Sequence, residues 1–440
     1  MGKGLRSIQF IVGKPNQTLF GGLVLFQQFC KKLNLQNRLT SILRRCHVWR
    51  NSSFKPGELL LALIYLTVAG IGRLSNARVL AYNGSLPKLL GLTRFPKPKV
   101  FRNLLKSLSP KAVAALSVLQ DQLRQESFHL KSRTSLILDF DSTVLPLFGW
   151  QIEGAKIGYN PRKPRRPSYH PLLCFETHTQ DIWHASLRPG DWNPITGLQP
   201  FTREALAKVP KGIYRIRVRA DAGFYDGDFI RLLDDKNIQF VIVAKMTRPI
   251  QGKLETLRYR SFQGHWQAAE FRYQPMRWLK PYRFIVVRRP KPENPLERAQ
   301  LTLFTLKRYV YHVFVTNLTL DPDSVWRFYK GRAQAELFIR QLKWDYPIGK
   351  IPTNNFRANQ AYFHLVLLAF SLTCYFKRMV LPKYFQKATL NKLRTDLFLL
   401  PAQLLRIHNR NVLKIPGDYA YTEALHTTLS RIHKLRWPKI

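Results

Sequence analysis

The order of strand-like and helical stretches between residues 131 and 246 constrains the fold more than any other feature of the chain. Three β-rich stretches come first: Ser135–Leu145, Ser168–His178 and Asp181–Leu187. Helical and strand-like stretches then alternate, as Thr202–Lys208, Tyr214–Ala220, Asp228–Asp235 and Gln239–Ala244. Three linked strands followed by alternating units are typical of a mixed sheet flanked by helices. We therefore predict an α/β fold for this part of the chain.

The flanking stretches have different patterns. Residues 1–130 place apolar residues at helical spacing, which predicts helices at Phe20–Leu33, Leu59–Ala69 and Lys111–Arg124. The pattern from Thr247 to Leu318 is all-β, with strands expected at Trp266–Tyr273, Tyr282–Arg289, Thr302–Leu306 and Tyr311–Val315. Two long helices are expected next, Ser324–Trp344 and Asn359–Met379. The last stretch mixes apolar and basic residues without a clear signal, and we interpret it as a basic helical tail.

The charge of the chain indicates the kind of partner it meets. Lys and Arg number 71 against 26 Asp and Glu, a formal net charge of +45. Such an excess repels itself in a compact fold, so a polyanion is the expected partner, and nucleic acid is the leading candidate. Residues 1–130 contain only three acids, Glu58, Asp121 and Glu126. This favours a helical region that contacts DNA over a bundle whose exposed faces are incidentally basic.

Other classes of protein are disfavoured. The four cysteines are scattered without a Cys-x-x-Cys pair, which argues against a disulfide framework and against structural zinc. Charged residues interrupt the N-terminus, where a secretory signal would lie. The longest uncharged apolar run, Ala361–Phe376, is shorter than the roughly twenty residues a membrane span needs. We expect a buried helix there and a cytoplasmic protein that contacts no membrane.

Acidic residues at strand ends stand out in so basic a chain. Asp139 and Asp141 are two residues apart on one expected strand, so both point to the same face of the sheet. Asp221 follows the expected strand Tyr214–Ala220 and precedes Ala-Gly, which allows close approach of a ligand. Glu336 lies in the middle of an expected helix. These acids are the candidate catalytic groups.

The helix expected around Glu336 carries a polar stripe. Tyr329, Arg332, Glu336 and Lys343 are spaced by three, four and seven residues and share one helical face. A separate apolar stripe can pack on the sheet, so the polar one is expected to face outward or into a groove. Spacing alone leaves open an ordinary amphipathic helix with surface ion pairs.

These residues resemble the signature of a known family. Tyr329-x2-Arg332-x3-Glu336-x6-Lys343 resembles the Tyr-Arg-Glu-Lys signature of bacterial insertion-sequence transposases of the Asp-Asp-Glu type. LDFDST around Asp141 and RADAGF around Asp221 are similar to the first and second aspartate motifs of that family. The segment Gly158–Leu173 (GYNPRKPRRPSYHPLL) resembles the stretch that follows the first aspartate in one subgroup. The resemblance covers roughly residues 130–380, with the motifs in the family's order.

The resemblance implies a ribonuclease H-like fold and a division of the chain. Residues 1–130 are expected to form a helical, basic, DNA-binding region. Residues 131–246 and 321–385 are expected to form the two parts of the catalytic domain, separated by an all-β insertion at 247–320. Residues 386–440 are expected to form a basic helical tail.

The implied activity is metal-dependent DNA cleavage and strand transfer at the terminal inverted repeats of a transposon, in a cut-and-paste reaction. Two divalent ions can activate the attacking oxygen and stabilise the leaving oxygen. Hard carboxylate ligands favour two Mg²⁺ ions, with Mn²⁺ as a substitute. Asp141, Asp221 and Glu336 are the expected ligands and catalytic residues. Asp141 is preferred to Asp139 because a small hydroxyl residue follows it, as after the family's first aspartate, but position alone does not separate the two.

The DNA contacts expected from the resemblance are Tyr329, Arg332 and Lys343, beside the scissile phosphate and at a hairpinned end. The basic loop Asn160–Pro167 adds four candidate cations, Arg162, Lys163, Arg165 and Arg166, although a solvated loop between strands is an equal reading. The partners would be the double-stranded transposon ends and the target DNA, bound by a homodimer in the bacterial nucleoid. Two alternatives remain: a nuclease of the same fold that does not transfer strands, and a non-catalytic DNA-binding protein.

Overall fold

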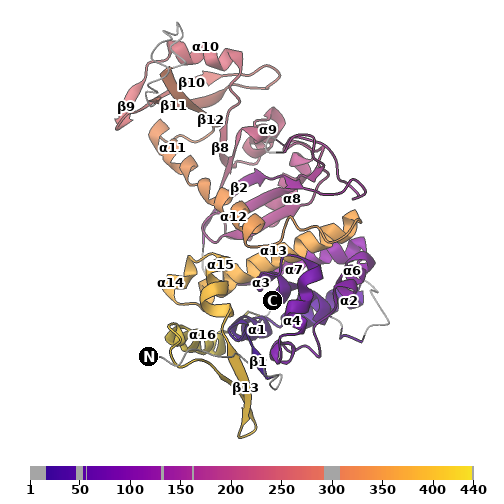
Figure 1. Cartoon of the computed structure of the whole chain (residues 1–440). Helices are drawn as coiled ribbons and strands as arrows, with labels where there is room; N and C mark the ends of the chain where they lie inside the picture. The colour runs from indigo at the N-terminus through magenta and orange to yellow at the C-terminus, as the bar shows by residue number, and fades with distance from the viewer. Residues whose placement is uncertain are drawn as a thin grey trace, which may run out of the picture. The chain divides into compact units, whose positions relative to one another are not determined.

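The computed structural model describes residues 16–45, 53–55, 57–129, 133–160, 163–291 and 308–438 (Figure 1). The chain divides into two compact units. Met1–Leu119 and Lys343–Lys439 form one, which we call the helical unit, and Gln120–Leu342 form the other, the sheet unit. The domain boundaries expected from the sequence remain a prediction.

The sheet unit is built on one mixed sheet in the order β6-β5-β2-β7-β8-β12-β11-β10-β9. The strands are β2 (Ser135–Ser142), β5 (Leu172–Glu176), β6 (Asp181–Ser186), β7 (Arg215–Ala220), β8 (Gln239–Val243), β9 (Arg260–Gln263), β10 (Trp266–Tyr273), β11 (Tyr282–Pro290) and β12 (Tyr309–Thr316). Strand β2 pairs antiparallel with β5 and parallel with β7, which pairs parallel with β8. The expected mixed sheet is therefore confirmed. Two short strands, β3 (Leu145–Pro146) and β4 (Ser168–Tyr169), pair separately.

The strands expected to form an insertion continue this sheet. Strand β12 pairs antiparallel with β8, with Phe314 opposite Val243, and β11, β10 and β9 follow outward. Pairing with β12 covers the backbone edge that β8 would otherwise expose. The stretch also contains a helix, α10 (Arg248–Thr256), that the all-β pattern did not predict. The expected strand Thr302–Leu306 lies outside the described residues.

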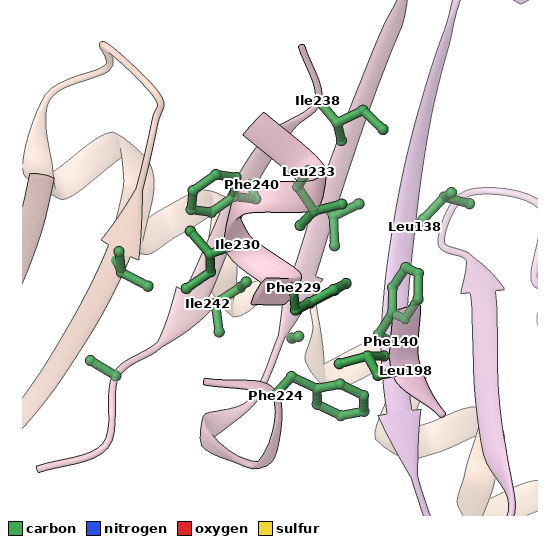
Figure 2. Close-up of a cluster of buried hydrophobic side chains, with 14 of the residues drawn as sticks. Leu138, Phe140, Leu198, Phe224, Phe229, Ile230, Leu233, Ile238, Phe240 and Ile242 are labelled. Atoms are coloured by element: carbon green, nitrogen blue, oxygen red, sulfur yellow. The ribbon is translucent and has the colours of Figure 1, made fainter. Parts of the chain in front are cut away.

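Helices α8 (Leu198–Ala207) and α9 (Gly227–Asp235) cover one face of the sheet (Figure 1). Figure 2 shows Phe229 and Leu233 of α9 directed toward Leu138 and Phe140 of β2, which are fully buried. Because side chains alternate along a strand, Asp139 and Asp141 must point to the opposite face. The apolar residues of β2 therefore fix where its two acids face.

The long helix expected at Ser324–Trp344 is two helices, α11 (Pro322–Lys330) and α12 (Ala333–Trp344). Gly331 lies at the break, and a Cβ atom built there would come 2.4 Å from Nη1 of Arg219. Arg219 also donates a hydrogen bond to the carbonyl of Phe328 near the end of α11 (2.7 Å). A glycine is a weak helix former, and here it also makes room for the guanidinium. Tyr329 and Glu336 are thus on different helices, and the prediction of one four-residue helical face was wrong.

The helical unit surrounds a long buried helix, α13 (Phe356–Met379). Its other helices are α1 (Leu23–Lys32), α2 (Leu35–Arg45), α3 (Glu58–Val68), α4 (Arg78–Ala81), α5 (Leu86–Leu89), α6 (Pro98–Ser107), α14 (Lys383–Gln386), α15 (Leu390–Leu393) and α16 (Thr422–Lys434), together with a 3₁₀ turn at Leu74–Ala77 and a π turn at Arg394–Phe398. Helix α7 (Pro110–His129) runs from this unit into the sheet unit. The apolar run Ala361–Phe376 lies buried within α13, as predicted. Among the described helices, none has the length and apolarity needed to cross a membrane.

The tail expected to be helical also contains β-structure. Strands β13 (Ala402–Ile407) and β14 (Arg410–Lys414) form an antiparallel hairpin. The two-residue strand β1 (Gln17–Thr18) pairs with the base of β13 and completes a three-stranded sheet. The stretch therefore alternates helix and hairpin and is not a continuous helical tail.

Candidate active site

Asp139 and Asp141 share a face of β2 but have different partners. Asp139 is fully buried and forms a two-pronged ion pair with Arg219, at 2.7 Å to Nε and 2.8 Å to Nη2. Thr177 donates a third hydrogen bond to it at 2.5 Å. Asp139 and Arg219 are opposite each other on paired strands, so the bridge is set by the register of β2 and β7. The oxygens of Asp139 are thus already used within the fold.

Asp141 lies with Asp221 and Glu336 around the guanidinium of Arg332. The Nη2 atom of Arg332 is 3.1 Å from Oδ2 of Asp141 and 3.3 Å from Oδ2 of Asp221. Nη1 is 3.4 Å from Oε1 of Glu336. Because both aspartate oxygens lie within 3.3 Å of the same nitrogen, they also lie close to each other. Three acids that are distant in the sequence meet at one cation.

The backbone explains how the two aspartates reach this place. Strands β2 and β7 are parallel neighbours, so their carboxyl ends meet at the same edge of the sheet. Asp221 directly follows β7 and accepts a hydrogen bond from the Gly223 amide at 2.8 Å, which caps the short 3₁₀ turn Ala222–Phe224. A Cβ at Gly223 would lie 2.9 Å from Oδ1 of Asp221, so glycine allows the chain to fold closely around the carboxylate. Asp141 accepts a similar bond from the Ser142 amide at 2.8 Å.

Burial and mutual repulsion make the cluster unusual electrostatically. Burial raises the pKa of Asp141 to about 7; Arg332 opposes this rise, and Asp221 and Glu336 add to it. Burial alone would lower the pKa of Arg332, but the surrounding acids hold it above its ordinary value. Arg332 therefore stays charged and compensates carboxylates that would otherwise repel one another.

Arg332 does not lie where the sequence pattern placed it. It was expected on a polar stripe facing outward or into a groove, but only 4% of it is exposed, between the three acids. Its Nε atom is buried without a hydrogen-bond partner among the described residues. The reason is the break between α11 and α12, which turns residue 332 inward. Within the described part of the chain, ion pairs with the three acids hold the side chain, and its third nitrogen has no acceptor.

The other two signature residues lie at different depths. Tyr329, at the end of α11, packs its ring against Phe314 with centroids 4.7 Å apart. Burial raises the pKa of its hydroxyl to about 12, an effect that Arg332 partly offsets. Lys343 lies on the last turn of α12 and is exposed. Among these four residues, Arg332 and Glu336 form an ion pair, and the Arg332 amide donates a hydrogen bond to the Tyr329 carbonyl at 2.8 Å.

The cations of the basic loop lie against an aromatic ring. Lys163 and Arg166 approach the ring of the exposed Phe148, at 5.7 and 4.8 Å from its centroid. Arg165 is exposed and has a positive φ of 60°. Arg162 lies outside the described residues. The described contacts bring these cations to Phe148 and not to the carboxylate cluster.

The donor set fits a hard divalent cation. Three carboxylates offer oxygen ligands of the kind that Mg²⁺ and Mn²⁺ prefer. Glu336 and Asp221 keep 65% and 42% of their side chains exposed, so a cation could reach them. As arranged around Arg332, however, no group of three His, Cys, Asp or Glu among the described residues is set to ligate one ion. The three acids are chemically suited to bind a metal ion, and in this structure the Arg332 guanidinium lies between their carboxylates.

Sequence reasoning missed two groups that position the site. In the sequence, Arg219 stands out only as part of the alternating strand YRIRVRA. It is buried in the structure, and its place on a strand beside one with a second aspartate was a usable signal that the two side chains pair. His170 is the second such group, and only 3% of it is exposed. Its ring nitrogens lie 2.6 Å from the Trp192 carbonyl and 3.2 Å from the Ser142 hydroxyl. It thereby braces the residue next to Asp141, and no spacing rule marks it.

Comparison with known proteins shows which family the chain belongs to. A family model described as transposase DDE domain group 1 matches residues 17–437. No curated protein matches the chain. Among solved structures, the chain is similar to the piggyBac transposase in a synaptic complex with hairpin DNA, at 12% identity and a TM-score of 0.45 over 98% of this chain and 83% of that one. Since the family model spans nearly all of the sequence, the chain belongs to the transposase DDE domain group 1 family.

Proposed function

We propose that this transposase binds the terminal inverted repeats of its element, cleaves them with Asp141, Asp221 and Glu336, and joins the ends to target DNA by cut and paste. The observation that carries this is the meeting of three sequence-distant carboxylates at Arg332. Family membership supports the general activity, since these enzymes cut and transfer DNA and generally use divalent metal ions. The strand order β6-β5-β2-β7-β8, with acids after β2 and β7, supports a ribonuclease H-like catalytic core.

The three acids would hold two Mg²⁺ ions, with Mn²⁺ as a substitute. When bound, such ions supply an activated nucleophile and charge stabilisation at the leaving oxygen. The protein contributes the placement of the acids: Asp141 and Asp221 are held by backbone amides, and Glu336 is held by the packing of α12. Asp139 is excluded from this set because Arg219 and Thr177 already occupy its oxygens.

When DNA binds, the Arg332 guanidinium would leave the three carboxylates and bind a phosphate of the DNA instead. A guanidinium prefers a two-pronged contact with a phosphate, and a metal-loaded cluster no longer needs its charge. Tyr329 lies half-buried beside it and can offer its hydroxyl to the same strand. Lys343 would contact a phosphate farther along the DNA. A homodimer would bring the two transposon ends together.

Nicking of supercoiled plasmid DNA bearing the element ends tests this proposal. Glu336→Gln should abolish Mg²⁺-dependent nicking, because it removes one ligand charge while leaving the buried face of α12 unchanged. Glu255→Gln is the matched control, an exposed glutamate of helix α10 that should nick as the wild type does. Full nicking by Glu336→Gln would refute the assignment of the site.

Strand transfer is tested separately from cleavage. Cleaved ends should appear joined to a second plasmid in the presence of Mg²⁺. Metal-dependent, Glu336-dependent cleavage without any joined product would instead identify a nuclease that does not transfer strands. Absence of both activities in the wild type, with duplex binding retained, would leave only DNA binding.

A further inference from the structure

The hairpin of β13 and β14 extends away from the helices of its own unit (Figure 1). At its base, β1 pairs with Ala402 and Gln403. From Arg406 to Val412 every residue is exposed, so neither face of this outer part is covered. An isolated two-stranded hairpin is marginally stable in water. A hairpin that is exposed on both faces is therefore a candidate surface for binding a partner.

The turn of the hairpin has a backbone conformation that suits a two-stranded ribbon. His408 and Asn409 both have positive φ, at 46° and 60°. Two successive left-handed residues form the turn type whose twist matches that of paired strands. Arg406 donates a hydrogen bond to the Asn409 side chain at 3.3 Å, which braces the tip. The two strands are thus held in register to their end.

One face of the hairpin, which we call the ribbon face, carries alternating apolar and basic side chains. Residues opposite each other on paired strands share a face. The pairs on the ribbon face are Gln403 with Lys414, Leu405 with Val412, and Ile407 with Arg410. Ile407 is 45% and Val412 38% exposed. Exposure of apolar side chains to water is unfavourable, so their presence on an open face indicates a binding surface. The opposite face carries Arg406 with Asn411 near the tip.

The ribbon face continues into a hollow at the hairpin base. The hollow has a volume of about 580 Å³, and its lining includes Gln17, Tyr82, Gln403 and Lys414. Gln17 pairs with Gln403, so these side chains lie on the ribbon face. Tyr82 is 84% exposed beside them. A strip of amide, apolar and cationic groups therefore runs from the tip to this hollow.

The charge of the hairpin has one sign. Between Asp396 and Asp418 the sequence contains no acid, while Arg406, Arg410 and Lys414 are all basic. A second copy of the chain would bring the same cations to this face and repel it. A polyanion is complemented by the same charges, and apolar groups among them can contact bases.

We propose that the ribbon face lies in the major groove of duplex DNA, with Arg410 and Lys414 on phosphates and Ile407 and Val412 against base edges. The partner rests on the proposed transposase function; the surface does not belong to its active site. A major groove about 12 Å wide accepts a two-stranded ribbon. Arg410 and Lys414 are separated by roughly 13 Å of strand, a length that spans such a groove.

Salt dependence of DNA binding by the full chain tests this contact. The probe is a duplex of about 30 base pairs of arbitrary sequence, titrated between roughly 50 and 200 mM KCl. Arg410→Ala and Lys414→Ala should each reduce the slope of log K against log salt by about 1, and the double variant by about 2. Arg406→Ala, on the opposite face of the same hairpin, is the matched control and should leave the slope unchanged. Thermal melting confirms that all variants are folded.

Several outcomes would overturn the proposal. An unchanged slope in the double variant would do so, as would an equal reduction by Arg406→Ala. If Val412→Ser dissociated a DNA-free dimer in sedimentation while the salt slope stayed intact, the ribbon face would be a subunit contact. Metal-dependent nicking that is lost in Glu336→Gln, together with an unchanged slope, would refute the ribbon contact alone. Failure of the wild type to bind any duplex would refute the transposase proposal as well.

Discussion

Replacing each aspartate of β2 by asparagine should have opposite effects on stability. Asp139→Asn removes the charge that faces Arg219 in a fully buried, two-pronged pair. Breaking a buried pair from one side costs about 3–5 kcal/mol, because the remaining charge is left uncompensated. Among the described residues, Arg219 would then keep the Phe328 carbonyl, the Thr177 hydroxyl and the Phe328 ring as partners, none of which carries a charge. We therefore expect a loss of about 3 kcal/mol or more in the free energy of unfolding.

Asp141→Asn should not destabilise the metal-free protein. Burial raises the pKa of Asp141 to about 7, so at pH 8 the folded state holds an ionised group that it disfavours. An unfolded aspartate has its pKa near 4, so between pH 4 and 7 this group progressively reduces stability. Asparagine cannot ionise, and the gain should be about 1 kcal/mol or more at pH 8 and vanish below pH 4.

Urea unfolding with EDTA present, followed by tryptophan fluorescence at pH 8 and pH 4, measures both effects. A shift of the midpoint at constant slope reports stability. The reasoning fails if Asp139→Asn matches the wild type while Asp141→Asn loses several kcal/mol. Plasmid nicking supplies a second arm: folded Asp141→Asn should be inactive. Nicking that survives Asp141→Asn but not Asp139→Asn would exchange the two roles.

Three further predictions concern the same elements. Arg332→Ala should lower the melting temperature without metal, because three acids lose their cation, and Mg²⁺ should raise it more than in the wild type; an equal response to Mg²⁺ would contradict this. Gly331→Ala should cost about 1–3 kcal/mol in urea unfolding, since its Cβ would meet Arg219 at 2.4 Å, whereas Gly252→Ala, with no atom within 4 Å, should cost nothing. Arg165→Gly should keep the turn, whose φ is 60°, and reduce the salt slope of DNA binding by about 1; an unchanged slope would show a solvated loop.

The central strands could be predicted because their pattern is local. Alternation in Tyr214–Ala220 and the helical pattern of Asp228–Asp235 depend on residues within each stretch, and the structure has β7 and α9 there. The parallel pairing of β2 with β7 then brings Asp141 and Asp221 to one edge. A sequence with these elements in this order already indicates where its acids meet.

The features that could not be predicted depend on distant contacts. The break between α11 and α12 depends on Arg219, which is far away in the sequence and needs the space left by Gly331. The burial of Arg332 follows from that break. Extension of the sheet through β12 depends on pairing with β8 and not on any local pattern.

The β13–β14 hairpin illustrates a turn without its usual residues. Such turns commonly contain glycine, and here His408 and Asn409 adopt the left-handed conformation. Basic residues interrupt the apolar alternation of both strands, so the stretch gave no clear signal.

Iron-directed cleavage of the protein tests most directly whether the three acids form one metal site. With hydrogen peroxide and ascorbate added, Fe²⁺ bound in place of Mg²⁺ is oxidised to Fe³⁺ as it reduces peroxide to hydroxide and a hydroxyl radical, and ascorbate returns the iron to Fe²⁺. The radicals cut the nearby backbone, and mass spectrometry locates the cuts. We expect cuts close to residues 141, 221 and 336 together, suppressed by excess Mg²⁺ and absent in Glu336→Gln. Cuts near only one of these residues, or a pattern that Mg²⁺ does not suppress, would contradict a shared site.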